Sequence, residues 1–351
     1  MKAFSMDQPI DVVIAWVDGD DPALKAKKDR FLAEQQQKQK LSNSGKATRR
    51  WENRDEILLC LQSIESHAPW VRKIWIVTDN QSPDLSSLNV RLRKKIAIVD
   101  HREIFRGFEQ YLPTFNSLSI ETVLWRIKGL ADRYLYFNDD FFLVGDLAPE
   151  DFFEGDKPVI RGRWTDWTGS KFSMYRRNKL NAAEAMGYTI DNVFSNAHVA
   201  YTFNKKILEA YYDQHPEVLE KNLSHRFREH SQLSSISLQT HWGIPRDLVV
   251  LKTQKDWLNV SVGVCQSGDA ELIKQKLTAL QKPKIKLGCI NDLAAAQETC
   301  PETLELLHRA IGIEPAKKKP RPDNAKQHRP PSSLFRAKRK LFKLLKLKKR
   351  Q

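Results

Sequence analysis

The sequence predicts an α/β fold with a mostly parallel sheet, and two observations support this prediction. Short β-branched and apolar runs alternate with helical apolar stripes along the first 150 residues, which is typical of parallel strands joined by helices. Several runs also end in acidic or amide residues: Asp18, Asp79, Asp100, and Asp139 with Asp140. In open α/β sheets the ligand site lies beyond the carboxyl ends of the strands. We therefore expect these side chains to face one crevice.

The predicted elements begin with a strand over residues 10–19, a β-branched run that stops at Asp-Gly. Residues 23–50 are rich in Lys, Gln and Ser and predict an exposed helix followed by a mobile loop. A second helix is expected to begin at residues 53–56, where an Asn and a Glu have capping-box spacing. Two further strands follow over residues 73–80 and 95–101, and each ends in polar residues.

A helical stripe over residues 120–127 leads to the most informative stretch, residues 134–143, where a short buried strand ends in Asn-Asp-Asp. Aromatic and aliphatic residues flank Asn138, Asp139 and Asp140 on both sides. Carboxylate and carbonyl oxygens suit Mg²⁺ or Mn²⁺, so the pattern indicates a metal site at the opening of a cleft. The alternative is a solvated turn, because Asn and Asp are common turn formers.

The chain after this strand has weaker strand signals. Residues 160–260 are rich in Trp, His, Arg and Asn, and we expect an α-rich half that completes the cleft. One main domain is thus predicted over residues 1–316, with an α/β half over 10–150 and an α-rich half over 151–316. The sequence has no Gly-x-Gly-x-x-Gly and no phosphate-loop lysine motif, which argues against dinucleotide or ATP binding.

The net charge of +15 is concentrated at the C-terminal end. Residues 317–351 contain 15 Lys or Arg and one acid, a net charge of +14, which leaves +1 for residues 1–316. A Pro-rich basic linker is predicted over residues 312–331. Residues 332–351 interleave Leu and Phe with Lys and Arg, as in cationic amphipathic helices on anionic membrane surfaces. A disordered basic tail is the alternative.

Other features of the composition limit the class of protein. The nearly neutral main domain argues against specific nucleic-acid binding. No run of about 18 apolar residues is present, so no membrane span is expected. The N-terminus lacks a signal-peptide pattern. The cysteines are widely spaced and fit a reduced, cytosolic protein better than a disulfide framework or a zinc site; they are Cys60, Cys265, Cys289 and Cys300.

Four stretches together resemble the Stealth family of sugar-1-phosphate transferases. That family includes bacterial capsule polymerases and the catalytic subunit of the lysosomal N-acetylglucosamine-1-phosphotransferase. The four stretches are residues 10–19, 54–140, 196–228 and 289–292. The second stretch is long and includes the Asn-Asp-Asp of the predicted metal site, and the third contains Asn-Ala-His and His-Arg-Phe-Arg.

The resemblance implies a core like that of GT-A nucleotide-sugar transferases. Residues 10–150 would bind the nucleotide sugar and the metal, and residues 151–316 would bind the acceptor. The implied reaction transfers a sugar-1-phosphate, with a UDP-sugar as the expected donor, to a saccharide or lipid-linked saccharide hydroxyl. It forms a phosphodiester, releases UMP, and would serve capsular polysaccharide synthesis. With the tail on the membrane, the expected location is cytoplasmic and peripheral, on the inner face of the cytoplasmic membrane.

The resemblance also implies roles for individual residues. Asp139, Asp140 and Asp292 would hold Mg²⁺ or Mn²⁺, and Asp140 is also counted as catalytic. His198 would accept the acceptor's proton, and Arg228 would bind the phosphoryl oxygens. The substrate-binding residues are expected to be Trp16, Asp18, Gly19, Arg54, Asp55, His101, Arg102, Asn116, Ser117, Asn138 and Asn291.

Two stretches depart from the family pattern, and alternatives remain open. The fourth stretch usually continues with polar residues, whereas Leu-Ala-Ala follows Asp292 here. An acid commonly follows the third-stretch arginine, whereas Gln232 stands in that region here. His198 has a purely structural alternative, and Arg228 has that of a surface ion pair. At the level of function, the alternatives are a conventional glycosyltransferase that releases UDP and a nucleic-acid-binding protein that uses its basic tail.

Overall fold

The computed structural model describes residues 8–38 and 56–313. The predictions for Arg54, Asp55, the helix start before Glu56, the Pro-rich linker and the basic tail therefore lie outside the described residues. The described residues all belong to one compact unit, Met1–Glu314.

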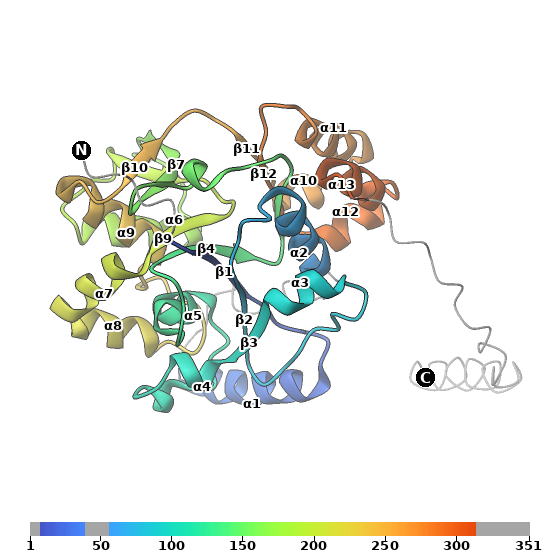
Figure 1. Cartoon of the computed structure of the whole chain (residues 1–351). Coiled ribbons are helices and arrows are strands. Elements are labelled where there is room, and N and C mark those ends of the chain that lie inside the picture. The colour runs from blue at the N-terminus through green and yellow to red at the C-terminus, as the bar shows by residue number, and fades with distance from the viewer. Residues whose placement is uncertain (1–7, 39–55, 314–351) are drawn as a thin grey trace, which may run out of the picture. The chain divides into compact units, whose positions relative to one another are not determined.

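A five-stranded sheet forms the centre of this unit, with the strand order β3-β2-β1-β4-β9 (Figure 1). Its members are β1 (Ile10–Ala15), β2 (Ile74–Thr78), β3 (Ile96–Asp100), β4 (Arg133–Asn138) and β9 (Tyr201–Asn204). The first four strands are parallel to their neighbours, and β9 is antiparallel to β4. This sheet confirms the predicted α/β class with mostly parallel strands.

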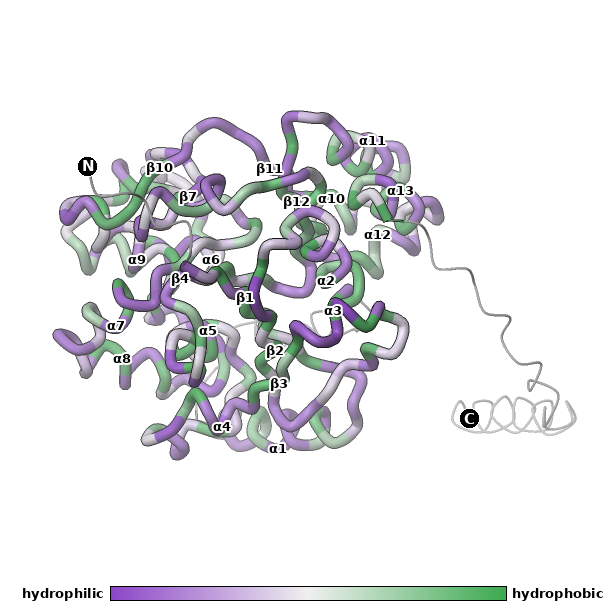
Figure 2. The backbone as a smooth tube through the Cα atoms, in the orientation of Figure 1, coloured by the Kyte–Doolittle hydropathy of each residue, from purple (hydrophilic) through white to green (hydrophobic). Residues whose placement is uncertain are grey.

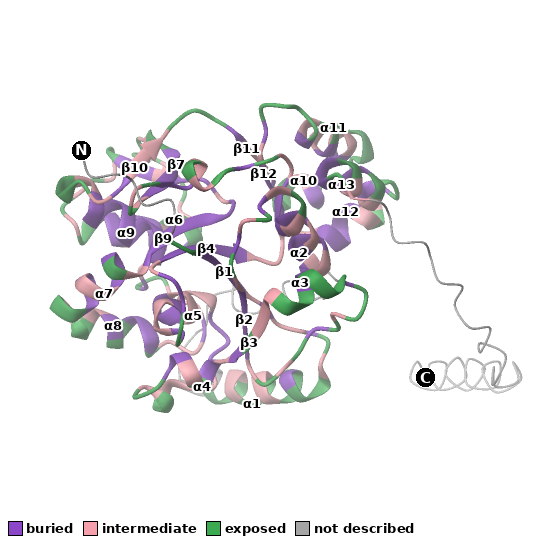
Figure 3. Cartoon of the chain, viewed as in Figure 1, coloured by how far each residue is buried: buried purple, intermediate pink, exposed green. Residues whose placement is uncertain are grey.

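The inner strands of the sheet are mostly apolar and buried, as expected where both faces of a sheet are covered. The residues of β2 are all buried, and those of β1 and β4 are buried except at the last residue of each strand. Figure 3 shows this burial and Figure 2 the hydropathy of the same segments. The chain places β2 and β3 on one side of β1 and β4 on the other. The crevice between the ends of β1 and β4 is therefore a topological switch point, the usual ligand position in such sheets.

Helices cover and connect these strands. In the first half they are α1 (Pro22–Lys38), α2 (Glu56–His67), α3 (Val90–Lys95), α4 (His101–Ile104) and α5 (Ser117–Val123), with short 3-10 turns at Glu109–Tyr111, Leu124–Arg126 and Pro149–Asp151. The α2 helix buries Ile57, Leu61 and Ile64, the apolar stripe expected of it.

The strand predicted to end at the acid pair is β4, and the apolar residues after the pair form a separate strand. The β4 strand ends at Asn138, Asp139 and Asp140 form a turn, and β5 (Phe141–Leu143) continues in a different sheet. That second sheet has the order β11-β12-β5, with β11 (Trp257–Val260) and β12 (Leu287–Ile290). The acid pair therefore lies where the chain passes from one sheet to another.

The second half contains helices and also short strands that the sequence signals only weakly. The helices are α6 (Met174–Glu184), α7 (Lys205–Gln214), α8 (Pro216–Leu223), α9 (Ser235–Gly243), α10 (Val262–Cys265), α11 (Ala270–Leu280), α12 (Leu293–Thr299) and α13 (Thr303–Ile311), with a 3-10 turn at Ile244–Arg246. A further sheet has the order β10-β7-β6, with β8 paired to β7. Its strands are β6 (Phe153–Glu154), β7 (Lys157–Thr165), β8 (Val193–Asn196) and β10 (Val250–Lys252).

The two predicted halves interleave in the sheets. The β9 strand belongs to the second half but completes the central sheet beside β4, and β12 pairs with β5 of the first half. Residues far apart in the sequence are thereby brought to the end of β4. Within the described ranges, no helix combines the length and the apolar character needed to cross a membrane.

Candidate active site

The carboxylate of Asp140 is held by residues of β12 and the segment after it. Asn291 donates from Nδ2 to Asp140 Oδ2 at 3.1 Å, and the Cys289 thiol donates to the same oxygen at 3.6 Å. The Ile290 amide donates to the Asp140 carbonyl at 3.1 Å. The other carboxylate oxygen, Oδ1, is buried and has no hydrogen-bond partner among the described residues. The second and fourth family stretches therefore meet at Asp140.

Both acids of the turn are harder to ionise than an ordinary aspartic acid. Burial raises the pKa of Asp139 well above its usual value, and the nearby charges of Asp140 and Glu56 raise it further. Burial also raises the pKa of Asp140 to about 6, against the hydrogen bonds from Asn291 and Cys289. Two adjacent acids with raised pKa values in a crevice are typical of a functional site, and a bound cation would stabilise their charged forms.

The His198 ring lies beside these acids, in the loop between β8 and β9. A ring nitrogen of His198, a carboxylate oxygen of Asp140 and the Cys289 Sγ all lie within 4.8 Å of one another. The Nδ1 atom is 2.9 Å from the Tyr201 hydroxyl and 3.3 Å from the Tyr175 hydroxyl. Burial raises the pKa of both phenols, so they remain protonated at neutral pH. The third family stretch thus reaches the same place as the second and fourth.

Two ionisable residues next to this cluster, the buried Lys179 and the half-buried Glu121, were not predicted from the sequence. Burial lowers the pKa of Lys179 to about 7, and burial raises the pKa of Glu121 to about 7. The Lys179 ammonium donates to the Asn196 carbonyl at 2.8 Å and lies 4.3 Å from the centre of the Tyr175 ring. Nearby positive charge from Arg228 and Lys179 lowers the pKa of Glu121 only in part. The sequence around Glu121 also contains Thr122 and Arg126, so it gave no signal that this acid is special.

Arg228 enters the site from the loop of residues 224–234 between α8 and α9. Its Nη2 donates to the Ser117 hydroxyl at 2.6 Å, at the first residue of α5. Its charge also lowers the pKa of Tyr136, against a larger effect of burial. The Tyr136 hydroxyl donates to Asn138 Oδ1 at 2.9 Å. Ser117, Asn138 and Arg228, three of the predicted site residues, are therefore linked.

Asn116 and Gln232 have structural roles in the same region. The fully buried Asn116 caps α5 by accepting from the Leu118 amide, and it donates to Gln232 Oε1 at 2.9 Å. Gln232 Oε1 also accepts from the Glu229 amide, and its Nε2 donates to the Ser119 hydroxyl and to the Asn222 carbonyl. A carboxylate could not make these two donations. An amide in place of the family's acid therefore fits the packing of this loop.

Trp16, Asp18 and Gly19 follow β1, whose last residue, Ala15, pairs with Asn138 of β4. They therefore lie at the same edge of the sheet as the acid pair. Trp16 is buried, and its Nε1 has no hydrogen-bond partner in the described part of the chain. Asp18 is fixed through its backbone, which donates to and accepts from the Gln81 side chain at 3.0 Å.

The remaining predicted residues lie outside this cluster of contacts. His101 begins α4 after β3, and burial lowers its pKa to about 4, against the charges of Asp79 and Asp100. The Arg102 amide donates to the side chain of Asp100. Asp292 caps α12 by accepting from the Ala295 amide, and its other oxygen accepts from Gln266 at 2.7 Å.

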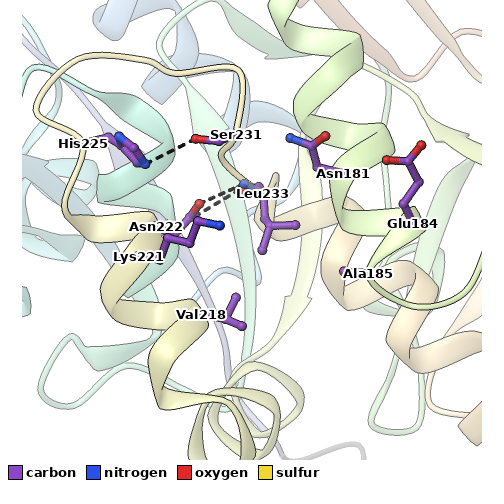
Figure 4. Close-up of a pocket in the computed structure, with 9 residues that line it drawn as sticks. All are labelled: Asn181, Glu184, Ala185, Val218, Lys221, Asn222, His225, Ser231 and Leu233. Carbon is purple, nitrogen blue, oxygen red and sulfur yellow. Dashed lines mark hydrogen bonds between the residues drawn. The ribbon is translucent and has the colours of Figure 1, made fainter.

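A separate cavity of about 310 Å³ lies on the α6 and α8 side of the Arg228 loop (Figure 4). Its wall includes Lys221, Glu184 and Asn181, and two residues of the loop, His225 and Ser231. The Ser231 hydroxyl and His225 Nε2 are 3.5 Å apart. None of the predicted metal-binding acids lines this cavity.

An acid pair lies at a topological switch point, and the His198 imidazole lies beside Asp140. Together they define an α/β protein with an enzyme-like polar site at the strand ends. The chain belongs to the Stealth family. Stealth protein conserved region 1 matches residues 8–36, and conserved region 2 matches residues 50–160. These matches confirm the family resemblance.

Relatives of the chain are named as polysaccharide phosphotransferases. An exopolysaccharide phosphotransferase of Streptomyces coelicolor is 33% identical over 67% of this chain and 25% of its own length. A capsular polysaccharide phosphotransferase of Streptococcus pneumoniae is 29% identical over 81% of this chain and 90% of its own length. The chain spans 25%, 42% and 39% of the lengths of three Streptomyces coelicolor exopolysaccharide phosphotransferases.

Similar solved structures are more distant. A galactosyltransferase crystallised with donor and acceptor sugar analogues is 11% identical, with 88% of this chain and 98% of that chain covered and a TM-score of 0.40. We draw no conclusion from a likeness of that size.

Proposed function

We propose that the protein transfers a sugar-1-phosphate from a UDP-sugar to a saccharide hydroxyl, in the synthesis of a capsular or other exported polysaccharide. The observation that carries the proposal is the meeting of three family stretches at one strand end. Asp140, His198 and Asn291 come together there, although the last of them follows the first by 151 residues. The names of the relatives support phosphotransferase chemistry on polysaccharides.

The acceptor hydroxyl would attack the phosphorus atom that carries the sugar. A new oxygen–phosphorus bond forms, the bond to the bridging oxygen of the diphosphate breaks, and UMP leaves. The hydroxyl proton passes to His198. Because Nδ1 of His198 faces the phenols of Tyr175 and Tyr201, we assign the acceptance of the proton to Nε2. The Tyr201 oxygen can accept a hydrogen bond from Nδ1–H, which would fix the required tautomer.

Arg228 would bind the non-bridging oxygens of the transferred phosphate. A guanidinium suits this task because its planar fork can donate two hydrogen bonds to a pair of phosphate oxygens. Its bond to Ser117 and the surrounding amide network hold the loop in place. Such chemistry depends mostly on positioning and on stabilising charge.

The residues of the β4–β5 turn fit a hard divalent cation such as Mg²⁺. Asp140 has a buried oxygen without a partner among the described residues, and Asp139 adds a second carboxylate next to it. Mg²⁺ commonly binds through one or two carboxylates and the substrate's phosphates, and when bound it neutralises phosphate charge. Asp292 receives no metal-binding role in this proposal, because both of its oxygens already accept hydrogen bonds.

The released nucleotide tests the proposal. Incubation with UDP-sugars, Mg²⁺ and candidate saccharide acceptors should release UMP, and chelation of the metal should stop the release. Glycosyl transfer is the alternative, since an acid pair at a switch point serves both reactions. Stoichiometric UDP would therefore favour the glycosyltransferase and rule out the phosphotransferase.

We also propose a peripheral location on the cytoplasmic face of the membrane. It is supported by the sequence of residues 332–351, which lie outside the described residues. A lipid-linked or exported acceptor would be made at that surface. Cationic amphipathic segments bind anionic lipids reversibly.

A further inference from the structure

The three groups nearest the centre of the site have different donor atoms. Asp140 offers oxygen, His198 offers nitrogen and Cys289 offers sulfur, and the three ligand atoms lie within 4.8 Å of one another. They come from the β4–β5 turn, the β8–β9 loop and β12. The antiparallel register pairs Cys289 with Phe141, the residue that follows Asp140. The sheet itself therefore holds the thiol beside the carboxylate.

This donor set does not suit Mg²⁺. Mg²⁺ prefers oxygen ligands in an octahedral arrangement, whereas imidazole and thiolate together select zinc-like cations. Zinc bonds of about 2.0–2.3 Å place the ligand atoms of one ion roughly 3–4 Å apart. Small side-chain adjustments would bring the three atoms to that spacing.

A second observation also points to a cation at the Asp140 carboxylate. Asp140 Oδ1 is buried without a hydrogen-bond partner among the described residues, while Oδ2 accepts from Asn291 and Cys289. A buried acceptor without a donor is uncommon in folded proteins. A cation bound by Oδ1 would satisfy it.

We propose that Asp140, His198 and Cys289 form a site for a thiophilic divalent cation of the zinc class, and that this cation inhibits the enzyme. On binding, the Cys289 thiol releases its proton to solvent. The ion would share Asp140 with the Mg²⁺ of the proposed reaction and would occupy the imidazole that takes the acceptor's proton. The inhibition rests on the proposed function, whereas the metal site itself does not.

Co²⁺ is the probe for the metal site, because a cobalt–thiolate bond gives a charge-transfer band in the near ultraviolet. Titration of the full-length, metal-free protein with Co²⁺ should produce this band, and added Zn²⁺ should remove it. Cys289→Ser should abolish the band. Cys300→Ser is the matched control, because Cys300 is also buried and also donates to a carboxylate, that of Glu302 at 3.6 Å. No band in the natural protein, or a band that persists in Cys289→Ser, would overturn the site.

His198→Gln provides a second variant for the spectrum and should weaken Co²⁺ binding by more than about tenfold. Thermal unfolding of each variant, compared with the natural protein, shows whether it has folded. Unchanged cobalt affinity in a folded His198→Gln protein would remove the imidazole from the proposed site.

Inhibition is tested separately, at saturating Mg²⁺. Zn²⁺ should stop UMP release by the natural protein and by Cys300→Ser at the same concentration. Activation by Zn²⁺ would overturn the inhibitory role and leave the metal site standing. If no UDP-sugar gives a product, the proposed function fails, and the cobalt spectrum still decides the metal site.

Discussion

At the scale of single residues, the two oxygens of Asp140 have different surroundings. Oδ2 accepts hydrogen bonds from Asn291 and Cys289, whereas Oδ1 is buried with no partner in the described ranges. The first oxygen fixes the carboxylate in one orientation, and the second is available for chemistry. A side chain that is both oriented and unsatisfied is costly to bury, which is why such residues occur mainly at functional sites.

His198 should be needed for turnover and much less for folding. The change His198→Ala should lower the rate of UMP release by about two to four orders of magnitude, the usual contribution of a general base. The rate under saturating donor and acceptor measures this effect. Tyr201→Phe keeps the ring and removes only the hydroxyl, and it should cause a smaller loss by freeing the tautomer of His198. A decrease of only a few-fold in His198→Ala would assign the imidazole to binding or packing.

Glu121 should make the protein less stable as the pH rises. Its folded-state pKa is about 7 because of burial, above the ordinary 4.5. The folded protein therefore binds the proton more tightly than the unfolded chain. Stability from this group is fully present below pH 4.5 and is lost as the pH rises through 7.

Glu121→Gln removes that titration. The free energy of unfolding of the variant, relative to the natural protein, should be higher at pH 8 than at pH 5, by on the order of 1 kcal/mol. Denaturant unfolding at the two pH values measures the difference. Glu184→Gln, an exposed change on α6, is the control and should show no such pH dependence. Equal shifts for both variants would remove Glu121 as the origin.

The sequence predicted the candidate polar groups that the structure brings together, but it did not predict the buried residues around them. Asp139 and Asp140 lie in conserved region 2, whereas His198 and Arg228 lie in a stretch that only resembles the family. Contacts of His198 and Arg228 join that stretch to the first half of the chain. Lys179 was missed, because a lysine in a helix has no local sign of burial. Its environment depends on residues that only the tertiary structure brings near.

At the scale of elements, the longer strands could be predicted from the sequence and the short ones could not. The β1, β2, β3 and β4 strands have five or six residues and were predicted from their apolar runs. The β8 and β10 strands have four and three residues, too few to show a period of two. The sequence also did not predict that the chain passes to another sheet after Asp139–Asp140, because apolar residues stand on both sides of the pair.

The loop of residues 224–234 should depend on the amide of Gln232. Gln232→Glu would replace two donations, to Ser119 and to the Asn222 carbonyl, with a buried carboxylate beside acceptors. We expect a loss of about 3 kcal/mol in unfolding free energy, the order found when a buried polar pair is broken. Thermal or denaturant unfolding measures it. Ser231→Glu places the same side chain on an exposed neighbour, and its stability should change little. Equal stability of the two variants would contradict the role of the amide.

At the scale of the whole molecule, charge and catalysis are separated along the chain. The groups of the proposed site lie between residues 16 and 291, while +14 of the net +15 charges belong to residues 317–351. Residues 1–316 carry almost no net charge, so electrostatic attraction to an anionic membrane would have to come from another part of the chain. The composition of the basic segment is suited to that purpose.

Deletion of residues 317–351 should abolish membrane binding and leave the enzymatic activity. Activity on a soluble acceptor should remain nearly unchanged, and sedimentation with anionic liposomes at low salt should be lost, since each basic residue near such a surface contributes about 1 kcal/mol. Neutral liposomes are the control for the full chain and should bind it weakly. Liposome binding by the shortened protein would place the anchor in residues 1–316, and loss of soluble activity would show that the segment belongs to the catalytic unit.

The antiparallel pairing of β12 with β5 has a consequence for the nascent protein. The central sheet needs nothing beyond β9, which ends at Asn204, whereas the hydrogen bond from Asn291 to Asp140 spans 151 residues. At translation rates of about 5–20 residues per second, the ribosome needs roughly 8–30 s to make that interval. A growing chain can therefore form its parallel strands while Asp140 still lacks its partners. Under the proposed function, chemistry at this site would begin only after the residues up to Asn291 have been synthesised, so shorter chains would be inactive.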